Sequence, residues 1–300
     1  MKYISVVPKL ILLITFFYST IYCQSDCTNT CDKNCDSNVI YAGVRSSSYG
    51  IRPFPTENEW ANALEKMSSY YPGSTPTAIW IVGVMGKDNC CKLLFPSDEK
   101  EYKNIIFDEI DKHEPFLNYF DKAGIKVFLQ VESANADMCT LMDLVLNRYK
   151  HHPCVIGFGV DVEWYRVSEK PNSGVEITDE TAELWEKKVK SFNPNYRLFL
   201  KHWDHRWMPP KYRGDILFVT DSQGHADLNA MVDEFSNSWA NFFKPNSVGF
   251  QIGYKEDKKI WEKFSNPPYE LGKLIVEKVK QNCGVFWVDF SLRDVNLLSE

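Results

Sequence analysis

The amino-acid sequence predicts an α/β protein in which eight parallel strands, joined by helices, close into a (β/α)8 TIM barrel. Apolar segments rich in β-branched residues alternate with amphipathic helical segments along the chain. The length of 300 residues, 44% of them hydrophobic, suits one large core. The rival architecture is an open, doubly wound sheet. No G-x-G-x-x-G turn follows the first strand and no P-loop occurs, so the closed barrel is favoured.

The expected strands are short, rich in β-branched or aromatic residues, and bounded by turn residues. They are 39–44, 78–83, 125–132, 155–165, 196–201, 215–220, 247–252 and 284–290. The expected helices have apolar residues three or four positions apart. They are 56–70, 98–121, 136–149, 179–191, 227–243 and 268–281. Thr56 and Glu59 form a capping box, Gly124 ends the second helix, and Thr178 opens the fourth. The link 202–214 is too short and too rich in proline for a full helix.

Residues 1–23 have the features of a secretory signal peptide. Lys2 and Lys9 flank the start, and 10–18 supply a short apolar core. The alternative is a signal anchor that stays in the membrane, but the apolar run is shorter than the roughly 20 residues that span a bilayer. No later segment is long and apolar enough to span. We therefore expect a secreted protein, or one in the lumen of the secretory pathway, with no membrane association after signal removal.

Nine cysteines are present, and eight remain when Cys23 is left out with the signal peptide. They are Cys27, Cys31, Cys35, Cys90, Cys91, Cys139, Cys154 and Cys283. An even number in an oxidising compartment predicts up to four disulfides. We expect a Cys-rich segment at 24–38, stapled by disulfides rather than by zinc, followed by a barrel at 39–300. The first three cysteines lack the Cys-x-x-Cys spacing and the nearby His of a zinc site.

The segment 155–165 is the candidate centre of the site. It reads as a strand buried on both faces and carries Asp161 and Glu163 two positions apart, so both acids point to the same side. Gly157 and Gly159 precede them on that side, which predicts room for a ligand. Ligands of parallel α/β folds bind at the carboxyl ends of the strands. The alternative is a structural pair, such as Asp161 bound to Lys201 inside the barrel.

Polar and aromatic residues at the other strand ends are the candidates for substrate binding. They are Gln130, Glu132, Lys201, Trp203, Asp221, Gln251, Tyr254 and Trp287. Acids beside aromatic rings suit a sugar, because carboxylates handle the proton and the oxocarbenium charge while rings stack on pyranose faces. Glu132 and Asp221 could instead be helix caps or ion pairs, Trp203 and Tyr254 could be loop packing, and Trp287 could be core. The six His show no metal-binding spacing, so we expect no metal and no cofactor. A net charge of -6 argues against nucleic acid as a partner, and nothing indicates an oligomeric state.

These residues resemble those of barrel glycosidases. Segment 148–157 looks like the lead into a fourth strand that ends in an acid/base Glu, and counting along that pattern reaches Glu163. Such enzymes carry a nucleophilic Glu on the seventh strand, where this chain has Gln251. Lysozymes of glycoside hydrolase family 25 also use D-x-E, and 42–49 is similar to their opening strand, with Arg45 in place of their Asp.

The chitinase and endo-β-N-acetylglucosaminidase family, glycoside hydrolase family 18, needs no such nucleophile. The fourth strand of that family ends in an alternating series of acids that closes with D-x-E. Segment 156–163 is similar to it, with Gly157, Asp161 and Glu163 on the pattern. Trp287 matches the family's eighth-strand Trp. Two earlier acids of the pattern are replaced by Ile156 and Gly159, and the family's sixth-strand Tyr is Thr220 here.

The resemblance implies that Glu163 protonates the glycosidic oxygen and that Asp161 orients the substrate's own N-acetyl group for attack on the anomeric carbon. The predicted function is a secreted glycoside hydrolase acting on β-linked glycans that contain N-acetylhexosamine. The alternative is a catalytically inactive, lectin-like barrel that binds carbohydrate, which the replaced motif residues favour.

Overall fold

Eight parallel strands form a closed ring in the computed structural model, which describes residues 38–298. They are β1 (Val39–Ser46), β2 (Thr75–Met85), β5 (Lys126–Val131), β6 (Val155–Asp161), β7 (Arg197–Lys201), β8 (Leu217–Thr220), β9 (Val248–Ile252) and β10 (Cys283–Val288). Each pairs in parallel with its neighbour, and the β1–β2 and β1–β10 pairings close the ring. The predicted (β/α)8 barrel is confirmed. The predicted signal peptide at 1–23 and the predicted Cys-rich segment with Cys27, Cys31 and Cys35 lie outside the described residues.

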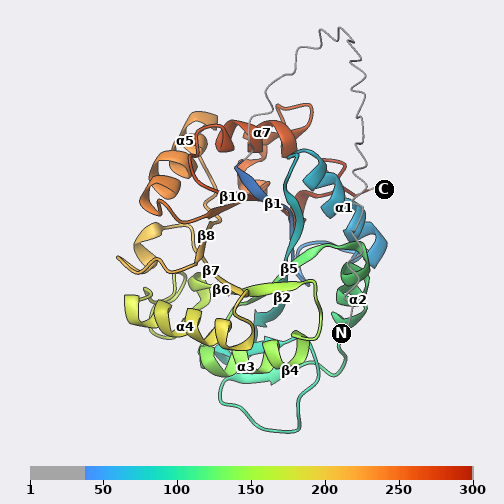
Figure 1. Cartoon of the computed structure of the whole chain (residues 1–300), viewed down its shortest axis with the longest axis vertical. Helices are drawn as coiled ribbons and strands as arrows, with labels where there is room; N and C mark the ends of the chain where they lie inside the picture. Colours follow the sequence, from blue (N-terminus) through green and yellow to red (C-terminus); the bar gives the residue numbers. More distant parts are fainter. Residues whose placement is uncertain (1–37, 299–300) are drawn as a thin grey trace, which may run out of the picture. The chain divides into compact units, whose positions relative to one another are not determined.

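Helices surround this ring of strands (Figure 1). They are α1 (Glu57–Ser69), α2 (Glu114–Ala123), α3 (Met138–Tyr149), α4 (Asp179–Phe192), α5 (Leu228–Asp233), α6 (Lys258–Trp261) and α7 (Pro267–Val276). The capping box of α1 is present: Glu59 N donates to the Thr56 side chain, and Thr56 N donates to Glu59 Oε2 at 2.7 Å. Between β7 and β8 the structure has only a 3₁₀ turn, His205–Trp207, in agreement with the sequence. No helix among residues 38–298 combines the length and apolar character needed to cross a bilayer.

The predicted helix at 98–121 is wrong over most of its length. Within this range the chain instead forms a short strand, β4 (Ile105–Phe107). It pairs in parallel with β3 (Cys91–Leu93), which in turn is antiparallel to the end of β2. Helix α2 begins only at Glu114, because Asp111 Oδ1 accepts hydrogen bonds from the backbone N–H groups of His113 (2.9 Å) and Glu114 (3.3 Å). The apolar residues of 105–107 therefore serve a strand pairing rather than a helix face.

The space beside Gly157 and Gly159 is filled by protein, which corrects the expectation of room for a ligand. A Cβ on Gly159 would lie 1.9 Å from Cζ of Phe199, and one on Gly157 would lie 2.8 Å from Cδ1 of Phe128. These rings belong to a cluster drawn from five strands and no helix, which fills the barrel interior. Its members are Ile79, Phe128, Phe199, Leu217, Val219 and Phe286. The bare backbone of β6 admits the rings of its neighbouring strands.

The five cysteines within the described residues are free thiols, so the prediction of disulfides is wrong for them. They are Cys90, Cys91, Cys139, Cys154 and Cys283. Cys91, Cys154 and Cys283 are buried: the first begins β3, the second directly precedes β6, and the third begins β10. Cys154 Sγ donates to the carbonyl of Leu117 at 3.6 Å. They behave as small apolar residues of the core.

We predict that Gly159→Ala lowers the free energy of unfolding by about 1–3 kcal/mol, because the methyl group overlaps the Phe199 ring in a closed interior. The measurement is urea denaturation. Gly86→Ala is the matched control, since its Cβ would lie 3.3 Å from the tip of the Ile106 side chain, which needs to shift by only a few tenths of an ångström. Phe199→Leu should recover part of the loss when combined with Gly159→Ala. Wild-type stability of the single variant would contradict this packing.

Candidate active site

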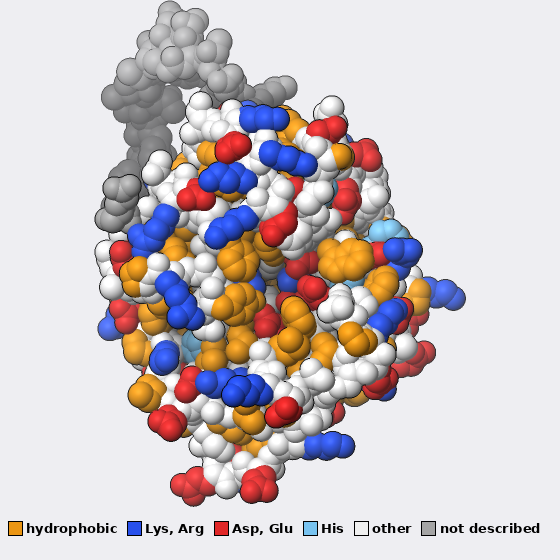
Figure 2. Space-filling model, turned by 180° about the vertical axis from the view of Figure 1, so that it is seen from behind, with side chains coloured by type: hydrophobic (Ala, Val, Ile, Leu, Met, Phe, Trp, Pro, Cys, Tyr) orange, Lys and Arg blue, Asp and Glu red, His pale blue; other side chains and the backbone are white. Residues whose placement is uncertain are grey.

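A cavity of about 440 Å³ opens at the carboxyl ends of the barrel strands. Its lining combines charged and aromatic side chains that end or follow six of the strands. They are Arg45, Tyr49, Asp161, Glu163, Trp164, Lys201, Asp221, Gln223, Tyr254, Lys255, Glu256 and Phe290. Figure 2 shows one face of the molecule, hollowed near its centre, where acidic side chains gather between hydrophobic ones. Parallel strands bring such residues together because their carboxyl ends meet at one face.

Lys201 joins two buried aspartates at the base of this cavity. Its Nζ lies 2.7 Å from Asp161 Oδ2 and 2.5 Å from Asp221 Oδ2, and Gln130 Nε2 donates to Asp161 Oδ2 at 3.3 Å. The structural pairing of Asp161 with Lys201, one of the two alternatives, is therefore present. Burying these charges singly would cost several kcal/mol each, so the three residues are held as a unit.

The two aspartates keep Lys201 charged. Burial acts to lower the pKa of Lys201, but Asp161 and Asp221 raise it well above its usual value. Burial also raises the pKa of Asp161; Lys201 opposes this shift, and the charge of Asp221 adds to it. A charged ammonium has no free electron pair, so Lys201 is not poised as a nucleophile.

Each aspartate keeps one oxygen free for a ligand. Asp161 Oδ1 and Asp221 Oδ1 are buried and accept no hydrogen bond from the described residues. Both side chains line the cavity. A buried acceptor without a partner costs free energy, so these atoms are suited to accept N–H or O–H groups of a bound molecule.

Glu163 reaches the cavity from a turn, not from the strand. β6 ends at Asp161, and Val162–Trp164 is a 3₁₀ turn, so the predicted strand 155–165 is too long and alternation does not place Glu163. Its carboxyl group makes no hydrogen bond or ion pair with residues 38–298. Burial raises the pKa of Glu163 to about 7, and the charge of Asp221 acts in the same direction. A carboxyl group that keeps its proton near neutral pH is suited to general acid catalysis.

Arg45, Tyr49 and Glu132 form a chain of hydrogen bonds beside the cavity. Arg45 Nη1 contacts Asp289 Oδ1 at 3.0 Å, Arg45 Nη2 donates to the Tyr49 hydroxyl at 2.6 Å, and that hydroxyl donates to Glu132 Oε1 at 2.5 Å. The other Glu132 oxygen accepts from the backbone of Met85 at 2.9 Å. Both oxygens of Glu132 thus accept hydrogen bonds from the protein, and Glu132 does not line the cavity. Glu132 therefore has a structural role, which was the alternative to substrate binding.

Of the predicted site residues, the fold brings together Asp161, Glu163, Lys201, Asp221 and Tyr254 in the cavity lining. Gln130 and Gln251 are buried and outside that lining, although each contacts a lining residue: Gln130 bonds to Asp161, and the Tyr254 hydroxyl donates to Gln251 Oε1 at 2.9 Å.

Two predicted tryptophans lie elsewhere. Trp287 is fully buried in the helix-facing core, 5.9 Å from Trp261, and its Nε1 donates to Ser291. Trp287 therefore has the core role, which was the alternative to substrate binding, because Phe286 is the residue of β10 that points into the barrel. Trp203 is stacked on His202, outside the cavity lining.

Sequence reasoning missed several residues of the lining. They are Arg45, Tyr49, Trp164, Gln223, Lys255, Glu256 and Phe290. Arg45 ends the first strand, where the strand-end rule could have found it. The others lie in turns and connections, where no periodicity indicates which way a side chain points.

A larger cavity of about 700 Å³ lies beside α2 and is lined by aromatic residues including Phe54, Trp80 and Phe116. Both acids in its lining are already paired, Asp108 with Lys92 at 3.4 Å and Asp111 with Arg148 at 2.7 Å. It offers no free carboxyl group, so the smaller cavity is the candidate active site.

No protein-family model matches this chain, and no curated protein matches it. Among solved structures it is similar to a GH18 chitinase from Pseudoalteromonas aurantia, with 10% identity and a TM-score of 0.46, covering 85% of this chain and 96% of that one. It is also similar to an arabinofuranosidase, with 11% identity and a TM-score of 0.41, covering 83% and 64% of the two chains. For an intracellular xylanase from Thermoanaerobacterium saccharolyticum the identity is 12%, the TM-score 0.35 and the coverage 86% and 90%. Likeness at this level assigns neither a family nor the role of a residue.

We predict that Glu163→Gln changes how stability depends on pH. The unfolded chain loses the Glu163 proton near the usual pKa of 4.5, while the folded protein keeps it until about 7. The wild-type free energy of unfolding therefore falls across this window, and the Gln variant lacks that fall. By pH 8 the variant should have gained about 2 kcal/mol relative to wild type, a figure discounted for the partial exposure of Glu163.

Urea denaturation of both proteins below and above this window measures the difference. Glu65→Gln, on the exposed face of α1, is the control and should follow the wild type at every pH. Parallel curves for wild type and Glu163→Gln would show that the pKa of Glu163 is not raised.

Proposed function

We propose that this protein is a glycoside hydrolase acting on β-linked glycans that contain N-acetylhexosamine, with Glu163 as the general acid and Asp161 assisting. The observation that carries the proposal is Glu163 itself. It is a carboxyl group in a cavity at the strand ends, without a partner among the described residues and with a pKa raised to about 7. Cleavage of a glycosidic bond needs a proton on the leaving oxygen, and Glu163 can supply it.

The charge of the cavity base supports the same chemistry. Two carboxylates, Asp161 and Asp221, share one ammonium group, that of Lys201. Burial favours the protonated form of Asp161. When Asp161 is ionised, the unit carries a net negative charge in a buried setting. Positive charge that develops at the anomeric carbon would be stabilised there, and more strongly than in water.

Asp161 is suited to hold the substrate's N-acetyl group. Its Oδ2 is occupied by Lys201 and Gln130, while its Oδ1 is free to accept the N–H of an acetamido group. That hydrogen bond would turn the acetamido oxygen toward the anomeric carbon, so the substrate would provide its own nucleophile. A Gln at position 251, where other barrel glycosidases carry a nucleophilic Glu, is then compatible with hydrolysis, because this mechanism needs no nucleophile from the protein.

The walls of the cavity suit a sugar ring. Tyr49, Trp164, Tyr254 and Phe290 line it and provide flat apolar surfaces against which pyranose faces can pack. A volume of about 440 Å³ lies within the range of small-ligand pockets.

A carbohydrate-binding barrel without turnover is the second candidate. Lys201 neutralises much of the charge of Asp161 and Asp221, which favours binding over catalysis. This candidate uses the same cavity and the same sugars, so only turnover separates the two. For either function we propose secretion or a lumenal location, because 1–23 resemble a signal peptide; recovery of the protein from the culture medium tests this.

We predict that the wild type cleaves chito-oligosaccharides and that Glu163→Gln lowers kcat roughly 100-fold or more, because general acid catalysis is lost. Substrate affinity should change only a few-fold, since the Gln side chain keeps the shape of Glu. Mass spectrometry of the products and calorimetric binding are the measurements, with Glu65→Gln as the control. Unchanged turnover in Glu163→Gln would remove Glu163 from the mechanism. Sugar binding by the wild type without cleavage would select the second candidate.

We also predict that kcat/KM of the wild type falls as the pH rises through about 7, because Glu163 loses the proton it must donate. The residual activity of Glu163→Gln should lack this fall, since Gln does not titrate. Rates measured from about pH 5 to about pH 9 decide the point. The same basic limb in both proteins would assign the titration to another group.

A further inference from the structure

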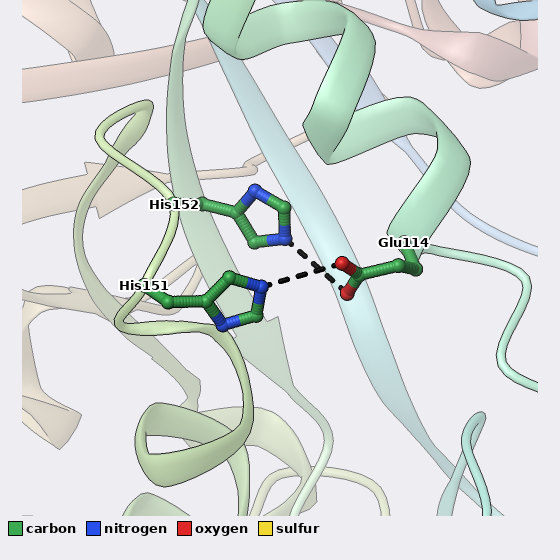
Figure 3. Close-up of side chains that lie close together, drawn as sticks. All are labelled: Glu114, His151 and His152. Atoms are coloured by element: carbon green, nitrogen blue, oxygen red, sulfur yellow. Dashed lines mark hydrogen bonds and ion pairs between the residues drawn. The ribbon is translucent and has the colours of Figure 1, made fainter.

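Three side chains with metal-binding atoms converge on the outside of the barrel, between α2 and the connection from α3 to β6. Glu114 is the first residue of α2, and His151 and His152 follow α3 (Figure 3). His151 Nε2 lies 3.3 Å from Glu114 Oε1, and His152 Nε2 lies 3.2 Å from Glu114 Oε2. The three ligand atoms lie within 4.8 Å of one another. None of these residues lines the candidate active site.

A second carboxylate orients His152. Asp121 Oδ2 lies 2.6 Å from His152 Nδ1, and Asp121 Oδ1 accepts the backbone N–H of Cys154 at 2.8 Å. A carboxylate at this distance places the proton on Nδ1, which leaves the electron pair of Nε2 directed at Glu114 and His151. A carboxylate behind a histidine in this way is the usual support of a metal-binding imidazole.

The contact between His152 and Glu114 is not a hydrogen bond. His152 is almost completely buried, and its Nε2 has no hydrogen-bond partner among the described residues although Glu114 Oε2 is only 3.2 Å away. In the neutral imidazole, an electron pair on the buried Nε2 faces the carboxylate of Glu114, which is 40% exposed, and the two repel each other. A cation between them removes the repulsion and gives both atoms a partner.

We propose that Glu114, His151 and His152 bind one divalent transition-metal ion of the zinc class. Zinc bonds of about 2.0–2.1 Å in a tetrahedron place ligand atoms about 3.4 Å apart. The distances from His151 Nε2 to Glu114 Oε1 and from His152 Nε2 to Glu114 Oε2, 3.3 and 3.2 Å, are close to this value. Two imidazoles with one carboxylate select zinc or its neighbours over calcium and magnesium, which prefer oxygen ligands. His151 is 57% exposed, so the fourth position faces solvent and takes water.

The adjoining set of Asp121, His152 and Cys154 fits a metal less well. Both oxygens of Asp121 already accept hydrogen bonds, and Cys154 Sγ donates to the carbonyl of Leu117 at 3.6 Å. A cation there would break three bonds, whereas the Glu114 set has an unfilled buried atom. In the proposed site Asp121 and its neighbours support the metal rather than bind it.

A metal at this position ties α2 to the connection that leads into β6. Asp121 already joins the later part of α2 to His152 and Cys154, and the ion would add a second link at the first residue of α2. Metal binding to the folded state alone raises stability in proportion to the logarithm of the free metal concentration. The site is therefore testable by stability and binding, independently of any sugar chemistry.

The test is calorimetric titration of the full chain with Zn²⁺, together with thermal unfolding. We expect one site filled at micromolar Zn²⁺ and a rise in Tm of about 2–5 °C. His151→Ala and Glu114→Gln should weaken binding at least tenfold, and Asp121→Asn should weaken it roughly 10- to 100-fold. His151 is exposed, so its replacement leaves the fold intact. His205→Ala, a histidine outside the cluster, is the matched control and should bind as the wild type does.

Co²⁺ in place of Zn²⁺ distinguishes this site from binding by cysteines. Nitrogen and oxygen ligands give a visible spectrum without the intense near-ultraviolet absorption of a thiolate–metal bond. A thiolate band that survives His151→Ala would overturn the proposal, as would wild-type affinity in both His151→Ala and Glu114→Gln. Failure of the wild type to bind Zn²⁺ at about 100 µM would also overturn it.

Discussion

The ion pairs of Lys201 with Asp161 and Asp221 are the interaction on which the rest of the site depends. They connect the ends of β6, β7 and β8, three neighbouring strands of the ring. Three charges out of water are tolerable only together, so the spacing of these strand ends and the protonation of the cavity are set by the same contacts. Burial raises the pKa of Glu163; the charge of Asp221 adds to this shift and that of Lys201 opposes it. The ion pairs of Lys201 with Asp161 and Asp221 therefore both stabilise the fold and set the charge of the candidate active site.

The packing below this unit fixes where a ligand can enter. Phe128, Phe199 and Phe286 fill the barrel interior, and the glycines of β6 let two of these rings approach the backbone closely. A filled interior leaves no passage through the barrel, so the cavity opens only at the carboxyl ends of the strands. The free Oδ1 atoms of Asp161 and Asp221 are consequently presented to whatever occupies that cavity.

The two candidate sites differ in which charged groups they bring together. At the strand ends one cation sits between two acids, and the free oxygens are left for an uncharged, hydrogen-bonding molecule. At the cluster of Glu114, His151 and His152 three side chains with metal-binding atoms converge, and the buried Nε2 of His152 has no hydrogen-bond partner among residues 38–298. The first arrangement suits a sugar and the second suits a metal ion, and no residue belongs to both.

The sequence by itself determined the barrel and the residues at its strand ends. Strand and helix periods are local properties, and parallel strands necessarily bring their carboxyl ends together, which is why Asp161, Lys201 and Asp221 could be grouped without coordinates. The sequence could not determine which face of a strand buried on both sides points into the barrel. We therefore placed Trp287 among the substrate-binding candidates, and we expected Gly157 and Gly159 to leave room for a ligand rather than for neighbouring rings. From the sequence we expected β6 to continue past Asp161 and 105–107 to be helical. Both predictions were wrong, because where a strand ends and whether a short segment pairs as a strand depend on partners distant in the chain. Tyr49, Phe290 and the pairing of Glu114 with His151 and His152 were decided by tertiary structure alone, since turns and contacts between layers leave no periodic signal.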